Sequence, residues 1–217
     1  MIKNLSKKRE RALKIFKLIK ELYPEAKTEL TGWETPFQFL ICIILSAQTT
    51  DKQVNKVVPK LFAKFPTAEV LAKADVDDVA DLIRGINYYK SKAKNIVKAS
   101  NVVMTNFGGK VPQNIDDLVK LPGVGYKTAN VFLNDLYEAN QGIAVDTHVK
   151  RVAQRLGFTS NNDPTKIAKD LENLFPKEMW HEVNSTLVLF GRYICTARKP
   201  KCEKCPVCKW CKVCSKH

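Results

Sequence analysis

Hydrophobic residues recur every three or four positions along most of this chain, which is the spacing of amphipathic helices. No segment shows a convincing alternation with the two-residue period of a β-strand. Residues 35–47 begin with a threonine and a proline, which is a typical helix start, and then run apolar on nearly every face. We therefore predict a helix here that is buried at the centre of a domain. Within residues 6–23, an amphipathic pattern runs through Leu13, Phe16, Ile19 and Tyr23.

The rest of the chain shows the same helical spacing, punctuated by glycine and proline. The connections between the predicted helices are short, as compact all-α folds prefer. The further predicted helices are one that starts at Asp51, then 67–73, 75–84, 90–106, a helix, tight turn and helix over 114–137, then 147–157, 164–175 and 177–194. The pattern as a whole predicts an all-α fold.

An excess of positive charge indicates a polyanionic partner. The 217 residues include 36 Lys or Arg and 22 Asp or Glu, which gives a formal net charge of +14. In a chain of this size, that excess favours nucleic acid over a merely soluble surface. The hydrophobic content of 45% argues against disorder, and no stretch of 18 apolar residues predicts a membrane span. The N-terminal charges are not followed by an apolar core, so no signal peptide is predicted.

Six of the seven cysteines lie within residues 195–214. Thiolates that converge on one point can hold a metal ion or an iron–sulfur cluster. Without a predicted secretory signal, we expect a reducing compartment, where clustered cysteines bind metal more often than they pair with one another. Cysteines recur at every third position from Cys202 to Cys214, so the spacing by itself permits several ligand sets, including a ferredoxin-like run and two zinc-binding pairs.

The segment LPGVGYKTAN predicts a tight turn between two helices. Gly123 and Gly125 can adopt backbone angles that other residues avoid, and they let a ligand approach the backbone. The amide groups at the start of the following helix favour an anion such as phosphate. A Walker loop is excluded because Tyr126, and not glycine, precedes the lysine. A purely structural turn is the alternative for this pattern.

Lys127 lies in the first turn of the second helix of this hairpin. The positive helix end and the neighbouring cations disfavour an ammonium ion, which predicts a pKa lowered toward that of a nucleophilic amine. A solvated lysine that contacts phosphate is the alternative, and the local sequence by itself favours it.

Three motifs in order resemble those of the endonuclease III family of DNA glycosylases. They are LPGVGYKTAN, then AVDTHVKRV about twenty residues later, and finally a C-x6-C-x2-C-x5-C tail. This family belongs to the helix-hairpin-helix superfamily with a Gly/Pro-rich loop and a catalytic aspartate. The resemblance covers almost the whole chain, from the apolar helix that ends in LSAQTTD to Cys211.

The resemblance implies two all-α domains, one of them discontinuous. Residues 28–139 are expected to form a helical barrel that carries the helix-hairpin-helix motif at 113–137. Residues 1–27 plus 140–217 are expected to form the iron–sulfur cluster domain. The active site is expected in the cleft between these domains, which is a common place for ligand sites.

The resemblance also implies the chemistry. Lys127 would attack the anomeric carbon of the sugar, displace the damaged base and form a Schiff base, after which β-elimination cleaves the strand on the 3′ side. Asp146 would stabilise the positive charge that develops on the sugar. Aspartate is also a good N-cap for the helix that begins at Thr147, and a cap would hold the carboxylate rigidly.

Since a stacked base cannot react, the target nucleotide must rotate out of the duplex. Gln48 matches the family glutamine that fills the gap. The family's opposite wedge is a Gly-Leu-Tyr-like loop, and this chain departs from it with Asn87 at the glycine position and Tyr88 at the wedge position. We expect Asn87 to tolerate a left-handed backbone there.

His148 is expected to line the pocket. The carbonyl groups expected to bind a monovalent cation are those of Val119, Leu121 and Val124, and the other expected DNA contacts are Gly123, Val124, Gly125, Arg198, Lys199 and Lys201.

The family pattern selects one set of ligands for a 4Fe–4S cluster: Cys195, Cys202, Cys205 and Cys211. Cys208 and Cys214 are then surplus, as free thiols or alternative ligands. The cluster would close the basic loop TARKPK and hold its charges against the DNA backbone, which gives affinity without sequence choice.

The favoured function is a bifunctional DNA glycosylase and apurinic/apyrimidinic lyase that removes oxidised pyrimidines. The expected partner is damaged double-stranded DNA, with no membrane partner, a monomeric state and a cytoplasmic, nucleoid-associated location. One alternative is a related glycosylase for mismatched adenine, thymine or uracil, although relatives that only remove the base usually lack a lysine at position 127. A non-catalytic DNA-binding module and a ferredoxin-like electron carrier are the others.

Overall fold

The computed structural model describes residues 2–214, with side chains from Leu5 onward. Within this range the regular elements are α-helices and short 3-10 helices, without a β-strand. The all-α prediction is therefore confirmed.

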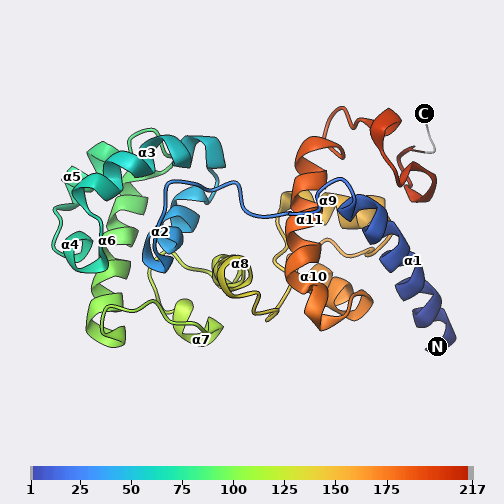
Figure 1. The fold of residues 1–217 in the computed structure, drawn as a ribbon, viewed down its shortest axis with the longest axis horizontal. Helices are drawn as coiled ribbons and strands as arrows, with labels where there is room; N and C mark the ends of the chain where they lie inside the picture. Colours follow the sequence, from blue (N-terminus) through green and yellow to red (C-terminus); the bar gives the residue numbers. More distant parts are fainter. Residues whose placement is uncertain (1, 215–217) are drawn as a thin grey trace. The chain divides into compact units, whose positions relative to one another are not determined.

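The chain divides into two compact units, which we describe separately. We call residues 29–137 the hairpin unit, and residues 1–28 together with 138–217 the cysteine unit. The blue N-terminal helix α1 (Ile2–Lys20) and the orange-to-red C-terminal segment belong to the same unit (Figure 1). The cysteine unit is therefore discontinuous in sequence.

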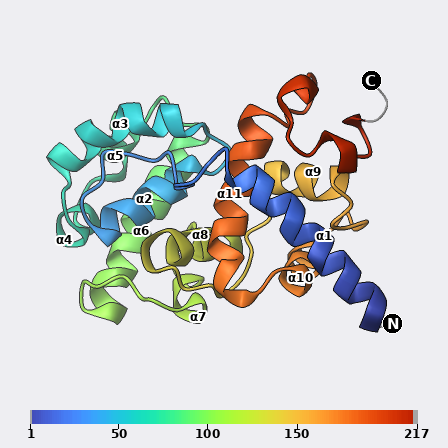
Figure 2. The same cartoon turned by 45° about the vertical axis from the view of Figure 1, so that its right-hand side comes forward.

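Helix α2 (Pro36–Ser46) forms the centre of the hairpin unit. Thr35 caps it by accepting a hydrogen bond from the amide of Gln38, at 3.2 Å. Because the helix is apolar on nearly every face, its residues 37–45 are all buried. Helices α3, α6 and α8 surround it (Figures 1 and 2), and the ring of Phe39 stacks on that of Phe132 with centroids 6.1 Å apart. The other helices of the unit are α3 (Asp51–Lys64), α4 (Ala68–Ala72), α5 (Val76–Leu82), α6 (Tyr89–Phe107), α7 (Ile115–Leu118) and α8 (Tyr126–Tyr137).

In the cysteine unit, α1 packs against α10 and α11, and α9 packs against the same two helices. Aromatic rings join these helices at the core. Phe175 lies edge-on to Phe16, at 5.5 Å between centroids, and to Phe158, at 5.7 Å. The elements after α1 are α9 (Thr147–Arg155), α10 (Pro164–Leu174), η1 (Lys177–Met179), α11 (Trp180–Tyr193), η2 (Cys202–Lys204) and η3 (Cys208–Trp210).

Helix α1 differs at both ends from the predicted range of 6–23. It begins at Ile2 and ends at Lys20. The early end has a steric cause, since Pro24 disfavours helical backbone angles at the residue before it, which is Tyr23.

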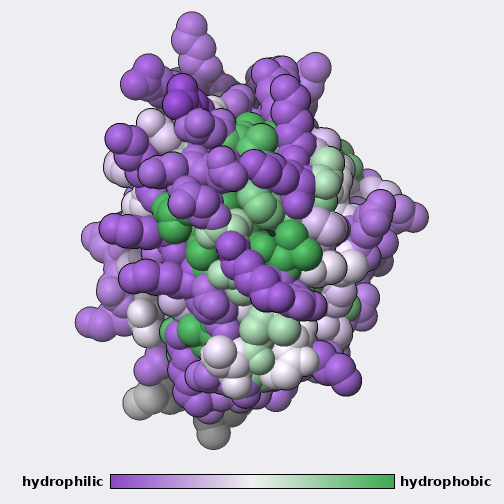
Figure 3. Space-filling model, turned by 90° about the vertical axis from the view of Figure 1, so that its left-hand side faces the viewer, coloured by the Kyte–Doolittle hydropathy of each residue, from purple (hydrophilic) through white to green (hydrophobic). Residues whose placement is uncertain are grey.

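On the face that carries α4 and α5, hydrophilic side chains cover most of the area and hydrophobic ones lie between them (Figure 3). Among the described residues, no helix has the length and apolarity that crossing a membrane requires.

Replacing Leu71 by alanine is expected to destabilise the hairpin unit by about 2–5 kcal/mol, because its side chain is fully buried in the helix that packs on α6. Its neighbour Val70 is 41% exposed and serves as the control, for which Val70→Ala should change stability by less than about 0.5 kcal/mol. Urea unfolding followed by circular dichroism measures both changes. Equal effects at the two positions would contradict the packing described for α4.

Candidate active site and cysteine cluster

The two glycines of the hairpin turn meet different requirements. Gly123 has a φ of +84°, and a Cβ there would lie 3.1 Å from Cβ of Asn95 in α6 and 3.2 Å from Cγ2 of Ile44 in α2. A larger residue would be both strained and crowded. Gly125 faces open space, since no atom beyond its chain neighbours lies within 4 Å of the place of a Cβ. The turn therefore packs on α2 and α6 through one glycine and leaves its backbone accessible at the other.

The turn exposes the start of α8. Helix α7 before it is capped by Asn114, whose Oδ1 accepts a hydrogen bond from the amide of Asp117 at 2.9 Å. The first amide groups of α8 have no acceptor within the helix, so this end favours an anion. Lys127 is the second residue of α8 and is exposed. An exposed amine therefore lies in the same helical turn as amide groups suited to a phosphate.

The three carbonyl groups expected to bind a monovalent cation also belong to this turn. The carbonyl of Leu121 accepts a hydrogen bond from the amide of Val124, at 3.0 Å, which leaves it one lone pair. No hydrogen bond from a described residue reaches the carbonyls of Val119 and Val124. All three oxygens thus keep capacity for a further ligand.

Asp146 is the N-cap of α9. Its Oδ1 accepts hydrogen bonds from the amides of His148 and Val149, each at 2.8 Å. Its Oδ2 accepts none from the part of the chain that the structure describes. The cap therefore fixes the orientation of the carboxylate and leaves Oδ2 available to interact with another group.

Arg151 determines the tautomer of His148. Nη2 of Arg151 lies 3.2 Å from Nδ1 of the imidazole. Because a guanidinium only donates, Nδ1 accepts and the proton of the neutral ring sits on Nε2. Arg151 also donates to the carbonyls of Gly191, at 2.6 Å, and Cys195, at 2.9 Å. The expected pocket histidine is thus held by α9 and the end of α11.

Gln48 and Tyr88 lie in two exposed turns of the hairpin unit. Gln48 follows α2 with a φ of +55°, and Tyr88 precedes α6 with a φ of +58° and is 68% exposed. The left-handed backbone expected at Asn87 therefore occurs at Tyr88, and that expectation is wrong. Asn87 has a different role, since its Nδ2 donates a hydrogen bond to the carbonyl of Gln48 at 2.6 Å.

Four thiols line one cavity of the cysteine unit, and they are those of the implied ligand set: Cys195, Cys202, Cys205 and Cys211. Burial raises the pKa of Cys195 and of Cys205, and the other three thiols raise the pKa of Cys205 further. Among the described residues, no three His, Cys, Asp or Glu side chains are arranged to hold a single metal ion.

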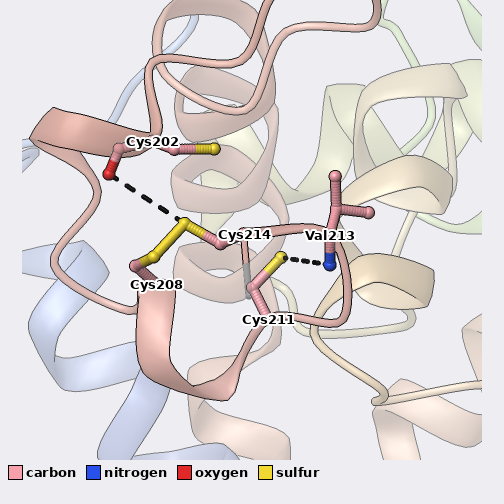
Figure 4. The surroundings of a disulfide bond; sticks show 5 residues. All are labelled: Cys202, Cys208, Cys211, Val213 and Cys214. Atoms are coloured by element: carbon pink, nitrogen blue, oxygen red, sulfur yellow. Dashed lines mark hydrogen bonds between the residues drawn. A yellow bond between two sulfur atoms is a disulfide. The ribbon is translucent and has the colours of Figure 1, made fainter. Parts of the chain in front are cut away.

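Cys208 and Cys214 form a disulfide with each other (Figure 4). The turn η3 brings their Cα atoms within 5.3 Å, a separation that a disulfide can span. The expectation of free thiols or alternative ligands at these two positions is therefore wrong. The remaining five cysteines stay as thiols.

Two arginines that the sequence analysis did not single out hold the cysteine-rich segment in place. Arg155 of α9 donates to the carbonyl of Thr196, at 2.8 Å, and to Sγ of Cys195, at 3.3 Å. Arg11 of α1 donates to the carbonyl of Trp210, at 3.0 Å. An arginine on the polar face of an amphipathic helix carries no local signal of such a contact, so only the fold reveals it.

The basic loop between Cys195 and Cys202 is exposed, and hydrogen bonds anchor it at both ends. The hydroxyl of Thr196 donates to the carbonyl of Lys199, at 2.6 Å, and the amide of Lys201 donates to the carbonyl of Ile194, at 2.9 Å. The side chains of Arg198, Lys199 and Lys201 are exposed. Their charges thus project from a constrained backbone.

The structure places the candidate residues in two groups. The hairpin unit holds Gln48, Tyr88, the carbonyls of the turn, Gly123, Val124, Gly125 and Lys127. The cysteine unit holds Asp146, His148, the four thiols and the basic loop with Arg198, Lys199 and Lys201.

The chain falls in the class of helix-hairpin-helix DNA repair proteins. Residues 41–177 match the family model of the HhH-GPD superfamily of base excision DNA repair proteins. The chain is 42% identical to endonuclease III of Synechocystis sp., over 94% of this chain and 93% of that protein. It is 41% identical to endonuclease III of Bacillus subtilis, over 86% of this chain and 85% of that protein.

Solved structures give the same result. A trapped covalent intermediate of endonuclease III with DNA superimposes with a TM-score of 0.91 and 37% identity, over 96% of this chain and 97% of the other. A thermostable thymine-DNA glycosylase superimposes with a TM-score of 0.83 and 28% identity, over 98% and 99% of the two chains. The chain belongs to the HhH-GPD superfamily and, within it, to the endonuclease III family. The resemblance inferred from the three motifs is thereby confirmed, as is its expectation of a base-excision enzyme.

Proposed function

We propose that this chain is a DNA glycosylase with apurinic/apyrimidinic lyase activity that removes oxidised pyrimidines from duplex DNA, with Lys127 as its nucleophile. The observation that carries this proposal is the exposed amine of Lys127 in the first turn of α8, two residues after the accessible backbone of Gly125. The family membership supports it, because base excision is the chemistry of the family.

In the proposed reaction, the lone pair of the Lys127 amine attacks the anomeric carbon of an extruded nucleotide. The bond to the base breaks, and the base leaves with its electron pair and takes up a proton. The sugar ring opens to a protonated imine with Lys127. That imine accepts electrons when the neighbouring sugar carbon loses a proton, so the bond to the 3′ oxygen breaks. Water then hydrolyses the imine and releases the lysine.

Asp146 supplies the negative charge in this proposal. Two amide hydrogen bonds hold its Oδ1, while Oδ2 stays available to face the positive charge that builds on the sugar. Lys127 belongs to the hairpin unit and Asp146 to the cysteine unit. His148, with its proton on Nε2, is proposed to line the pocket.

We also propose that Cys195, Cys202, Cys205 and Cys211 hold one 4Fe–4S cluster. The four thiols line one cavity, and the family pattern assigns them together to one cluster. The positive charge of iron would also stabilise the thiolate of Cys205, which burial and the neighbouring thiols disfavour. The cluster supplies no step of the reaction.

With the cluster bound, the basic loop is the proposed contact to the DNA backbone, through Arg198, Lys199 and Lys201. Gln48 and Tyr88 are proposed to fill the space of the extruded nucleotide, and Gly123, Val124 and Gly125 to contact phosphate. The carbonyls of Val119, Leu121 and Val124 are the candidate ligands of a monovalent cation there.

The thymine-DNA glycosylase likeness makes base removal without strand cleavage the main alternative.

Borohydride trapping on a duplex with one oxidised pyrimidine tests the nucleophile. The wild-type protein should become covalently linked to the DNA, because borohydride reduces the imine to a stable amine. Lys127→Ala should abolish the link and strand cleavage. Lys120→Ala is the control, since Lys120 is an exposed lysine of the same hairpin. A link that survives in Lys127→Ala would assign the nucleophile to another amine, and a wild type that removes the base without a link would support the alternative.

Substitution of Asp146 separates its two roles. Asp146→Asn should leave stability within about 0.5 kcal/mol of the wild type, since asparagine caps helices as well as aspartate does. The rate of base removal should fall roughly 10²–10³-fold, because the charge is lost. Asp146→Ala should add a loss of about 1 kcal/mol in stability. Single-turnover kinetics and thermal unfolding measure the two effects, and an active Asp146→Asn would exclude the charge from the mechanism.

The iron content of cysteine variants distinguishes the proposed cluster ligands from the other two cysteines of the segment. Cys205→Ser should lose most of the bound iron and acid-labile sulfide, because one thiolate of the set is gone. The double variant Cys208→Ser with Cys214→Ser should keep both at the wild-type level, since these two cysteines pair with each other. Loss of iron only in the double variant would reverse the ligand assignment.

A further inference from the structure

A buried lysine joins the two exposed turns of the hairpin unit. Lys92 lies in the first turn of α6 and is only 6% exposed. Its Nζ donates to the carbonyls of Leu45, at 2.7 Å, and Ala47, at 2.5 Å, and to the hydroxyl of Thr49, at 3.1 Å. The three N–H groups of an ammonium thus meet three oxygens at the end of α2 and in the turn after it.

This arrangement suits a structural cation. Burial lowers the pKa of Lys92 to about 8, while the three oxygens act in the opposite direction because they stabilise the ammonium. A neutral amine has only two N–H groups and would turn its lone pair toward one of these oxygens. The carbonyls at the end of α2 have no partner in the helix, so Lys92 satisfies groups that would otherwise be left unpaired.

Asn87 completes the connection. Its Nδ2 donates to the carbonyl of Gln48 at 2.6 Å, and its backbone amide donates to the hydroxyl of Thr49 at 3.3 Å. The backbone amide of Lys92 donates to the carbonyl of Tyr88 at 3.0 Å. The turn that carries Gln48 and the turn that carries Tyr88 are therefore bonded through the same two residues, Asn87 and Lys92.

The conformation held by these bonds is an unusual one. Gln48 and Tyr88 both have a positive φ, which costs energy for residues with a side chain, and both are exposed. Strained exposed residues that neighbouring groups hold in place often mark functional sites. Here the strain coincides with the two side chains that point away from the unit's core.

We propose that Asn87 and Lys92 are positioning residues that lock the Gln48 turn and the Tyr88 turn into one rigid element for insertion into DNA. This inference rests on the proposed function, in which these two side chains fill the gap left by the extruded nucleotide. Two turns that are already ordered lose little conformational entropy when they enter the duplex. More of the favourable binding free energy is then available to extrude the nucleotide. Asparagine at position 87 contributes a bond from the Tyr88 turn to the Gln48 carbonyl that glycine has no side chain to make.

The test compares two substrates, because only one of them requires insertion. Asn87→Ala should lower the single-turnover rate of base removal from an oxidised pyrimidine in duplex DNA roughly 5- to 10-fold, as expected for one lost hydrogen bond. Borohydride trapping on an abasic site in a single-stranded oligonucleotide should remain at the wild-type level, since no base must be extruded there. Asn55→Ala is the matched control, because its amide bonds the carbonyl of Glu29 at 2.8 Å in the same unit. It should leave both rates unchanged.

A double-mutant cycle shows whether Asn87 acts through Gln48. If it does, adding Asn87→Ala to Gln48→Ala should slow base removal by less than twofold beyond Gln48→Ala alone. Lys92→Met should reduce the duplex rate more than Asn87→Ala does, and Lys92→Arg should restore part of it by offering donors to the same oxygens. Thermal unfolding of each variant shows whether the unit stays folded.

The outcomes separate this inference from the proposed function. A wild type without activity on either substrate would overturn the proposed function and the inference with it. An active wild type whose Asn87→Ala variant removes the base at the wild-type rate would overturn the inference alone. Equal losses on the duplex and on the single strand, or additive effects of Asn87→Ala and Gln48→Ala, would also overturn it.

Discussion

Each helix leaves backbone amides at its start and carbonyls at its end without a partner in the helix, and several candidate functional residues of this chain lie at such helix ends. The open amides of α8 stand in the turn that carries Lys127. The first amides of α9 bind Asp146, which holds that carboxylate in one orientation. The carbonyls at the end of α2 bind Lys92, which holds the turn of Gln48. One constraint of helical geometry thus orients the carboxylate of Asp146 and the turn of Gln48, and it leaves open amides in the turn of Lys127.

The same constraint works differently in the cysteine-rich segment, which has little regular structure to satisfy its own backbone. Arginines from helices reach across to its carbonyls, with Arg155 at Thr196 and Arg11 at Trp210. A guanidinium suits this work because its rigid fork of donors can bond several oxygens at once and stays charged. Charge of one sign therefore has two uses in this unit. These arginines hold the segment in place through hydrogen bonds. The exposed side chains of Arg198, Lys199 and Lys201 can bind a polyanion.

The departure of this chain from its family at the second turn has a physical explanation in the fold. Tyr88 has the left-handed backbone, at φ +58°, and Asn87 uses its side chain to bond the carbonyl of Gln48. A bulky residue in that conformation depends on its surroundings, because its own backbone preference opposes it. The bonds from Asn87 and Lys92 provide those surroundings. The loop therefore keeps a left-handed residue through bonds made by its neighbours.

The sequence by itself determined the features that depend on residues close together along the chain. The all-α class, the buried α2 with its Thr35 cap, the hairpin glycines, the cap at Asp146 and the motifs of the family are all of this kind, because periodicity, capping and turn formation act within a few residues. Only the tertiary structure decided the buried position of Lys92, the hold of Arg155 on Cys195 and the pairing of Cys208 with Cys214. Lys92 and Arg155 bond atoms forty or more residues away. The two cysteines pair because of how one irregular turn folds back. Identical residue types on a helix face or at a repeated spacing carry no mark that tells which of them the fold will bring together.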